Sequence, residues 1–100
     1  MSRLIINADD LGYSPAVNRA IADLFRAGLV TSASILVNLP HSEEGAQIAA
    51  RYPRLSVGVH LNLSKGCPLL PATRLPSLVD ETGRFWNSAV LYRRALLRQI

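Results

Sequence analysis

The sequence contains a single cysteine, Cys67, so no disulfide can form within one chain. Such sparing use of cysteine is typical of proteins that work in a reducing compartment. Long apolar runs are also absent from the sequence, and its first residues do not follow the pattern of a signal peptide. We therefore expect a cytoplasmic protein with no transmembrane segment.

Acidic and aromatic residues are scarce, with 7 Asp and Glu against 11 Lys and Arg and an aromatic content of 6%. The formal net charge is +4, but the basic residues are scattered along the chain. A nucleic-acid-binding protein normally gathers basic residues on one face and interleaves them with aromatics. The scatter therefore argues against a nucleic-acid partner. The last cluster, Arg93, Arg94 and Arg98, could touch anionic lipid if it lies on an amphipathic helix.

The chain is apolar for its length, with 49% hydrophobic and 18% charged residues over 100 positions. This length is enough for one small domain or for a piece of a larger one. A tightly packed core would explain the composition. Apolar surface that faces further chain, a partner or a second copy would explain it equally well, and would favour a homo-oligomer.

Three apolar runs predict buried strands, over residues 3–7, 31–37 and 55–63, with residues 8–13 as a turn after the first. Helical periodicity between these runs predicts two helices, and a loop rich in proline and glycine leads to a last helix from about Ser88. The alternation predicts an α/β fold in which parallel strands alternate with helices.

The ends of the two inner helices have clear signals. Ser14 is a good N-cap, Pro15 suits the first helical position, and Gly28 is the expected stop. The second helix is expected to begin near Ser42 and to end before Pro53.

The third predicted strand has one apolar and one polar face, because side chains alternate along a strand. The polar face carries Ser56, Gly58, His60, Asn62 and Ser64. A strand covered by helices on both sides should be apolar throughout. The interior of a barrel or cleft around a polar ligand would explain the polar face. An antiparallel strand with one wet face would also explain it, although the helical alternation disfavours that arrangement.

Asp9 and Asp10 follow the first predicted strand, at the edge where sites gather in parallel α/β proteins. Adjacent residues of an extended chain point opposite ways, but at a turn both can reach one site. A cation or a pKa shift would offset the cost of burying two carboxylates. Taken alone, however, such a pair is more often a turn or a cap, and a single histidine such as His60 is more often a core residue than a ligand.

Three further residues are candidates for contact with a substrate. Tyr13 and Trp86 could stack on a sugar ring, although aromatic residues more often fill cores. Asn62 shares the polar face of the third strand with His60. Cys67 has no obvious base partner and is expected to be inert.

In combination the motifs are more specific than any one of them. Residues 7–12, NADDLG, resemble the N-A-D-D-[FL]-G opening of YdjC-like carbohydrate deacetylases. Residues 28–34, GLVTSAS, resemble the G-x-[VI]-[TS]-S-x-S segment of that family, and residues 58–64, GVHLNLS, resemble its G-[VL]-H-L-x-L-T element. Similarity continues in the same order to about residue 85, and is nearest to the hopanoid-biosynthesis-associated branch.

The resemblance implies a polysaccharide-deacetylase-like (β/α) barrel, of which residues 1–100 would be a truncated N-terminal portion. It also implies removal of acetyl groups from an N-acetylated sugar or glycolipid with a divalent cation, Mg²⁺ or Zn²⁺. By position, Asp9 matches the general base of the family, and Asp10 and His60 match two of its three metal ligands. The third, a later histidine in relatives, has no match here.

Besides an arginine-rich binder of nucleic acid or of a membrane surface, which the scatter of basic residues disfavours, two functional interpretations remain. The first is a deacetylase whose isolated 100-residue segment is inactive or nearly so, because a ligand and the acid that protonates the sugar amine are missing. The second is a non-catalytic α/β module that self-associates or pairs with a partner chain.

Overall fold

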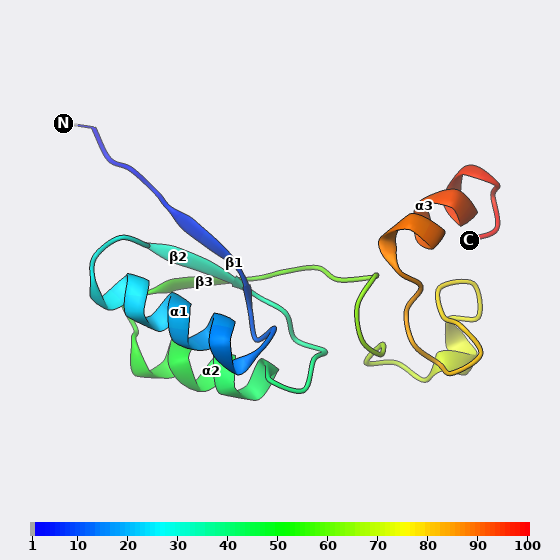
Figure 1. Ribbon diagram of the computed structural model, residues 1–100, viewed down its shortest axis with the longest axis horizontal. Helices are drawn as coiled ribbons and strands as arrows, with labels where there is room; N and C mark the ends of the chain where they lie inside the picture. Colours follow the sequence, from blue (N-terminus) through cyan, green and yellow to red (C-terminus); the bar gives the residue numbers. More distant parts are fainter. Residues whose placement is uncertain (1) are drawn as a thin grey trace. The chain divides into compact units, whose positions relative to one another are not determined.

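The computed structural model describes residues 2–100, which form two compact units, one ending at Leu61 and the other spanning Asn62–Ile100 (Figure 1). In the first unit the elements are β1 (Asn7–Leu11), α1 (Pro15–Arg26), β2 (Ser32–Ile35), α2 (Ser42–Arg51) and β3 (Ser56–Val59). The second unit holds a short 3-10 turn, η1 (Ala72–Arg74), and α3 (Ser88–Leu96). The prediction of parallel strands alternating with helices is confirmed.

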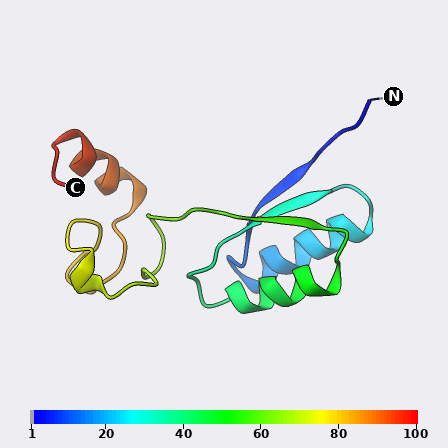
Figure 2. The same ribbon diagram turned by 180° about the vertical axis from the view of Figure 1, so that it is seen from behind.

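The three strands lie in the order β1-β2-β3, so β2 is central and both of its neighbours run parallel to it. Figures 1 and 2 show α1 and α2 on the same side of the sheet. This arrangement is expected when successive right-handed crossovers advance in one direction. One face of the sheet is therefore covered by helices, and no helix of the first unit covers the other.

The covered face contains the core. Leu11, Ile21, Val30, Ala33 and Leu55 form one buried cluster between the sheet and the two helices. Each contributes apolar area removed from water, at about 25 cal/mol per Å². Ile48 of α2 is partly buried and packs against this cluster, so the core ties β1, β2 and both helices together.

The predicted helix ends are confirmed. The hydroxyl of Ser14 accepts a hydrogen bond from the Val17 amide at 3.2 Å, and Pro15 is the first residue of α1. Gly28 follows the helix with a φ of +73°, a left-handed conformation that glycine adopts without strain. The second helix, α2, begins at Ser42 and ends before Pro53, as expected.

The predicted position of the first strand is wrong. The structure places β1 at Asn7–Leu11 rather than at residues 3–7, and therefore within the stretch expected to be a turn. Leu4 and Ile5 are each 77% exposed, and no element of the described chain covers them. The pairing with β2 starts only where the Ile6 carbonyl accepts from the Thr31 amide at 2.9 Å. The partner strand, and not the apolar run, sets where β1 begins.

The other two strands are shorter than predicted, since β2 covers four residues of 31–37 and β3 covers four residues of 55–63. No helix among residues 2–100 is both long and apolar enough to cross a bilayer.

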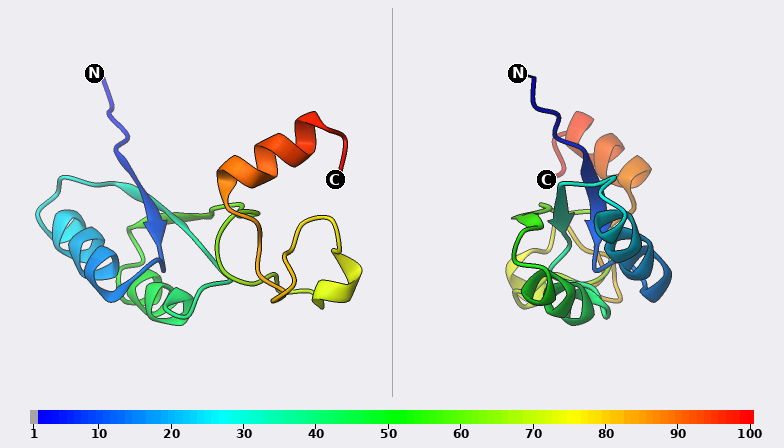
Figure 3. Two further views of the ribbon diagram at one scale, coloured as in Figure 1. Left: turned by 45° about the vertical axis from the view of Figure 1, so that its right-hand side comes forward. Right: turned by 90° about the vertical axis from the view of Figure 1, so that its left-hand side faces the viewer.

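The second unit has little regular structure (Figure 3). An isolated antiparallel bridge joins Val79 to Phe85, and Val79 is buried. The side chain of Asn87 caps α3 by accepting a hydrogen bond from the Val90 amide at 3.0 Å. Turns and caps therefore hold this unit together more than a shared core does.

Candidate metal and active site

A β-bulge shapes the carboxyl half of β1. Ala8 pairs with Ala33 and Leu11 pairs with Ile35, so Asp9 and Asp10 together stand opposite one residue of β2. Such an extra residue redirects side chains and is uncommon in parallel pairs. Asp10 has a φ of 69°, in the left-handed region that few residues other than glycine adopt. The bulge, rather than a turn after the strand, lets two adjacent carboxylates serve one side of the sheet.

His60 is the first residue after β3. Its amide donates to the Ile35 carbonyl at 2.8 Å, which extends the pairing with β2 by one residue and fixes the backbone of the histidine. Its ring atom Nδ1 lies 3.2 Å from Oδ1 of Asp10. The structure therefore brings together Asp10 and His60 from the two edge strands, across the end of β2.

The contact between Asp10 and His60 has a spacing that suits either an ion pair or two ligands of one cation. Nδ1 of His60 is buried and has no hydrogen-bond partner of suitable geometry among residues 2–100, although the carboxylate oxygen is close. Two ligand atoms bound at about 2.1 Å to one ion are separated by roughly 3.0 to 3.4 Å, depending on the coordination angle. Within the described chain, no group of three or more His, Cys, Asp or Glu residues is placed to hold a metal.

Asp9 is held by different partners. Its Oδ1 accepts hydrogen bonds from the Ser34 hydroxyl at 2.7 Å and from the Asn7 side-chain amide at 2.9 Å. Asp9 and Asn7 are both exposed on the face that no helix of the first unit covers. A carboxylate in this position can accept a proton from a small molecule that binds the open face.

Asn18 is a functional candidate that the sequence analysis missed. It is fully buried in α1, its Oδ1 accepts from the Gly12 amide at 2.6 Å, and its Nδ2 donates to the His41 carbonyl at 3.2 Å and to Oε2 of Glu44 at 2.9 Å. It thereby ties the loop after Asp10 to the start of α2. The only signal of this role in the sequence is that Asn18 is a polar residue on the otherwise apolar side of the first helix.

Glycines allow the same loop to approach α2 closely. Gly12 has a φ of +91°, and a Cβ on Gly45 would lie 3.0 Å from the Gly12 nitrogen and 3.1 Å from its Cα. Both contacts are with backbone, which cannot easily move. The segment from Asp9 to Gly12 is therefore held at one end by pairing with β2 and at the other by close packing against α2. Packed elements on both sides fix the position of the site.

The predicted substrate-binding residues are divided between the two units. Tyr13 follows the bulge, and its amide donates to the Asp10 carbonyl at 3.0 Å. Asn62 and Trp86 belong to the second unit. The side chain of Asn62 closes its own turn, by accepting from the amides of Ser64 and Lys65 and donating to the Lys65 carbonyl. The guanidinium of Arg94 lies over the ring of Trp86, 5.1 Å from its centroid, and covers one face that a sugar could use.

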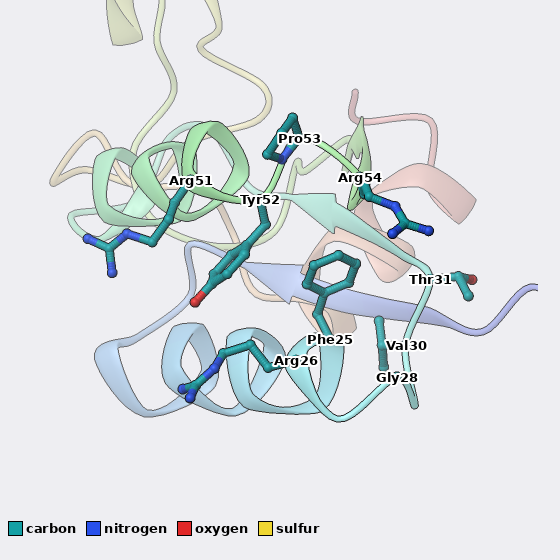
Figure 4. A pocket seen from close by; sticks show the side chains of 9 residues that line it. All are labelled: Phe25, Arg26, Gly28, Val30, Thr31, Arg51, Tyr52, Pro53 and Arg54. Atoms are coloured by element: carbon teal, nitrogen blue, oxygen red, sulfur yellow. The ribbon is translucent and has the colours of Figure 1, made fainter.

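A cavity of about 540 Å³ opens at the amino ends of β2 and β3 (Figure 4), and neither Asp10 nor His60 is among its lining residues. The rings of Phe25 and Tyr52 lie 5.5 Å apart in its wall. Its remaining lining residues are Arg26, Gly28, Val30, Thr31, Arg51, Pro53 and Arg54. No carboxylate, imidazole or thiol is among its described lining residues.

Carboxylates and an imidazole at the carboxyl ends of parallel strands define an α/β protein of the kind that places its site beyond the strand ends. Comparison with known proteins narrows this class. A sequence profile of the family described as YdjC-like protein matches residues 3–100, and the chain belongs to that family.

The relatives are named carbohydrate deacetylases. The one from Enterococcus faecalis is 42% identical over 103 residues, which cover 98% of this chain and 38% of that protein. The one from Geobacillus stearothermophilus is 47% identical over 81 residues, covering 81% of this chain and 32% of its own. The mouse protein is 39% identical over 94 residues, covering 94% of this chain and 30% of its own. The chain thus spans well under half the length of the curated relatives it matches.

A solved structure has a similar fold over the same part of the chain. A crystal structure from Enterococcus faecalis, of a protein provisionally described as a cellobiose-phosphate cleavage protein, superposes with a TM-score of 0.84 at 41% identity. The match covers 95% of this chain and 38% of that one. The chain therefore has the fold of the corresponding part of a longer α/β protein.

Proposed function

We propose that this chain supplies the base and two cation ligands of a deacetylase that removes acetyl groups from N-acetylated sugars. The observation that carries the proposal is the approach of Asp10 Oδ1 to His60 Nδ1 at 3.2 Å, with Nδ1 otherwise unpartnered among residues 2–100. Membership of the YdjC-like family and the names of the relatives support the reaction class.

In this proposal Asp10 and His60 hold a divalent cation, and Asp9 acts as the general base. When bound, the cation would supply Lewis acidity toward the acetyl carbonyl. Asp9 would take a proton from the water that attacks that carbonyl. Its position on the open face, held through Oδ1, supports this role.

The cation is proposed to be Zn²⁺ or Mg²⁺. One imidazole and one carboxylate form a mixed nitrogen and oxygen set, which suits zinc and accommodates other divalent ions. The proposal requires a third ligand, and an acid for the sugar amine, from outside this chain. The 100-residue chain alone is accordingly expected to release no measurable acetate from an N-acetylglucosamine oligomer.

Cation binding can be tested without activity, by adding Mn²⁺ to the isotope-labelled chain and following paramagnetic broadening of its amide signals. Broadening is expected to centre on Asp10 and His60, and to require at least about tenfold more Mn²⁺ in Asp10→Asn and His60→Gln. Competition by Zn²⁺ and Mg²⁺ identifies the preferred ion.

Two matched controls make this test specific. Asp23→Asn removes an exposed carboxylate of α1, and His41→Gln removes the other histidine. Neither should change the broadening. If the controls weaken it as much as Asp10→Asn does, or if Mn²⁺ leaves the wild-type signals unchanged, the cation proposal fails.

We also propose that the chain lies in the hopanoid-associated branch and acts in the cytoplasm. The sequence similarity and the single cysteine support this assignment. The substrate would then be an N-acetylated glycolipid. Deacetylation by the natural polypeptide that carries these residues should be faster on an N-acetylglucosaminyl lipid than on a free oligomer; the reverse preference would contradict the branch.

A second candidate function, self-association, is favoured by exposed apolar residues at both edges of the sheet. Leu4 and Ile5 precede β1, and Val59, the last residue of β3, and Leu61, two residues further on, are 63% and 88% exposed. Open edges with apolar side chains invite pairing with another strand. Sedimentation at several concentrations should show a mass that rises with concentration, and a constant monomer mass would exclude this candidate.

A further inference from the structure

The segment at residues 28–34 has no role in the proposed chemistry, yet its serines reach the base. Ser32 and Ser34 lie on β2, on the sheet face that no helix of the first unit covers. The Ser32 hydroxyl donates to Oδ1 of Asn7 at 2.8 Å, and the Ser34 hydroxyl donates to Oδ1 of Asp9 at 2.7 Å. A polar network therefore crosses from β2 to β1 at two successive levels.

Asn7 connects the two levels. Its Nδ2 donates to Oδ1 of Asp9 at 2.9 Å and to the Ser34 hydroxyl oxygen at 2.9 Å, while its Oδ1 accepts from Ser32. The orientation of this amide follows from chemistry, because an ionised carboxylate can only accept hydrogen bonds and so must face the NH₂ group. With this orientation, each of the four hydrogen bonds of the network joins a donor to an acceptor.

Within this network only one of the two carboxylate oxygens of Asp9 accepts hydrogen bonds. Both hydrogen bonds to this carboxylate end on Oδ1, and no donor among residues 2–100 reaches Oδ2. Two donors on one oxygen restrict rotation of the carboxylate, and the second oxygen stays available to a proton. The network does not include Asp10 or His60, which approach each other separately.

We propose that Ser34, supported by Asn7, is a positioning residue that fixes the Asp9 carboxylate independently of the cation ligands. The proposal rests on the assignment of Asp9 as the base, and deepens it. A hydroxyl suits this place because it donates to the carboxylate while accepting from Asn7. An alanine can do neither, and a threonine can do both while fitting a strand. Held in this way, the base keeps its orientation whether or not a cation is bound.

A purely structural role for Ser34 makes different predictions. If the hydroxyl only stabilised the sheet, Ser34→Ala would lower stability and leave the Asp9 side chain in one conformation. If it positions the base, Ser34→Ala should leave the sheet and Mn²⁺ binding intact but release the Asp9 side chain. Partial exposure of the network favours the second outcome, since hydrogen bonds open to water add little net stability.

The decisive measurement is the side-chain rotamer of Asp9, from its Hα–Hβ couplings in the labelled 100-residue chain. The wild type should show one rotamer, and Ser34→Ala should show couplings averaged over several. Ser34→Thr should restore the single rotamer. Ser56→Ala is the matched control, because Ser56 lies on the same face as the register partner of Ser32 and makes no side-chain hydrogen bond among residues 2–100. It should leave Asp9 unchanged.

A single Asp9 rotamer in Ser34→Ala would overturn the positioning role. Mn²⁺ broadening, recorded on the same samples, separates this result from a failure of the proposed function: a wild type that binds no Mn²⁺ refutes the cation site, while the couplings still decide on Ser34. In a natural polypeptide that deacetylates, Ser34→Ala should lower kcat about tenfold or more at unchanged KM. Ser34→Thr should recover most of that loss.

Discussion

The first unit holds its residues through strands and helices that share one core, whereas the second unit is held by turns, one isolated bridge and side-chain caps. The residues proposed for the chemistry, Asp9, Asp10 and His60, all belong to the first unit. Small displacements of a catalytic group are costly, so such groups are best carried by elements that packing fixes. This difference predicts that substitutions in the core of the first unit change the stability and geometry of the site. Substitutions in the second unit should change only the structure around the substituted residue.

The largest effect is expected from Leu11→Ala. Leu11 is fully buried and directly follows Asp10, so the truncation leaves a cavity beneath the bulge. We expect a loss of about 3 kcal/mol in the free energy of unfolding, measured by urea titration of the helical circular dichroism signal. Val79→Ala, at the buried residue of the second unit, should leave amide exchange in the sheet unchanged. Equal effects of the two substitutions would show that the units unfold together.

Gly45→Ala should destabilise the chain by about 1 to 3 kcal/mol, the usual range for overpacking. Its new Cβ would meet the backbone of Gly12, whereas alanine in an ordinary helix is favoured over glycine. Gly58→Ala is the control, since a Cβ there meets nothing within 4 Å. Thermal unfolding of both variants measures the difference. A neutral Gly45→Ala would mean that the loop after Asp10 is free to move away from α2.

The two helix caps allow a matched comparison of the units. Ser14→Ala and Asn87→Ala each remove one side-chain acceptor from a helix start, worth about 1 kcal/mol. Because α1 packs on the core, Ser14→Ala should lower the unfolding midpoint of the first unit. Asn87→Ala should instead fray α3 and leave that midpoint in place. Residue-specific amide exchange distinguishes the outcomes, and a shift of the midpoint in both variants would contradict the comparison.

The smallest effect concerns pH and the turn at Asp80. The Thr82 hydroxyl, donating at 2.6 Å, lowers the pKa of Asp80 below its ordinary value of 3.8, with help from the amides of Arg84 and Thr82. A lowered folded pKa means that the stabilisation is present above the ordinary value and is lost as the pH falls through the folded one.

The amide signals of Thr82 and Arg84 should therefore move together on acid titration, with a midpoint below 3.8. Asp80→Asn cannot titrate and should give flat curves. Movement of the sheet amides with the same midpoint would show that the turn is coupled to the first unit.

Local signals predicted the helices well. Ser14, Pro15 and Gly28 act through neighbouring residues only, so their roles can be recognised without knowledge of the fold. The parallel order also follows from the alternation of strands and helices. The first strand was misplaced because the apolar run at residues 3–7 gives no information about where its partner, β2, begins.

The sequence named the residues of the candidate site and indicated that Asp10 and His60 lie together, but it did not reveal the bulge that brings them together. The approach of Asp10 to His60 depends on a bulge whose register is set by pairing with β2, and no local pattern encodes it. The burial of Asn18 and its contact with Gly12 depend on how α1 meets α2. The assignments of Asp9, Asp10 and His60 to catalysis and cation binding stay predictions until the measurements above are made.

The bulge makes the number of residues in β1 as important as their identity. Removing either Asp9 or Asp10 would leave one residue opposite Ser34 and restore an even ladder between Ala8 and Leu11. The remaining aspartate could then occupy only one of the two positions, and no substitution elsewhere in the strand would return the other. Point changes at this site can be graded and compensated, but a single-residue deletion cannot.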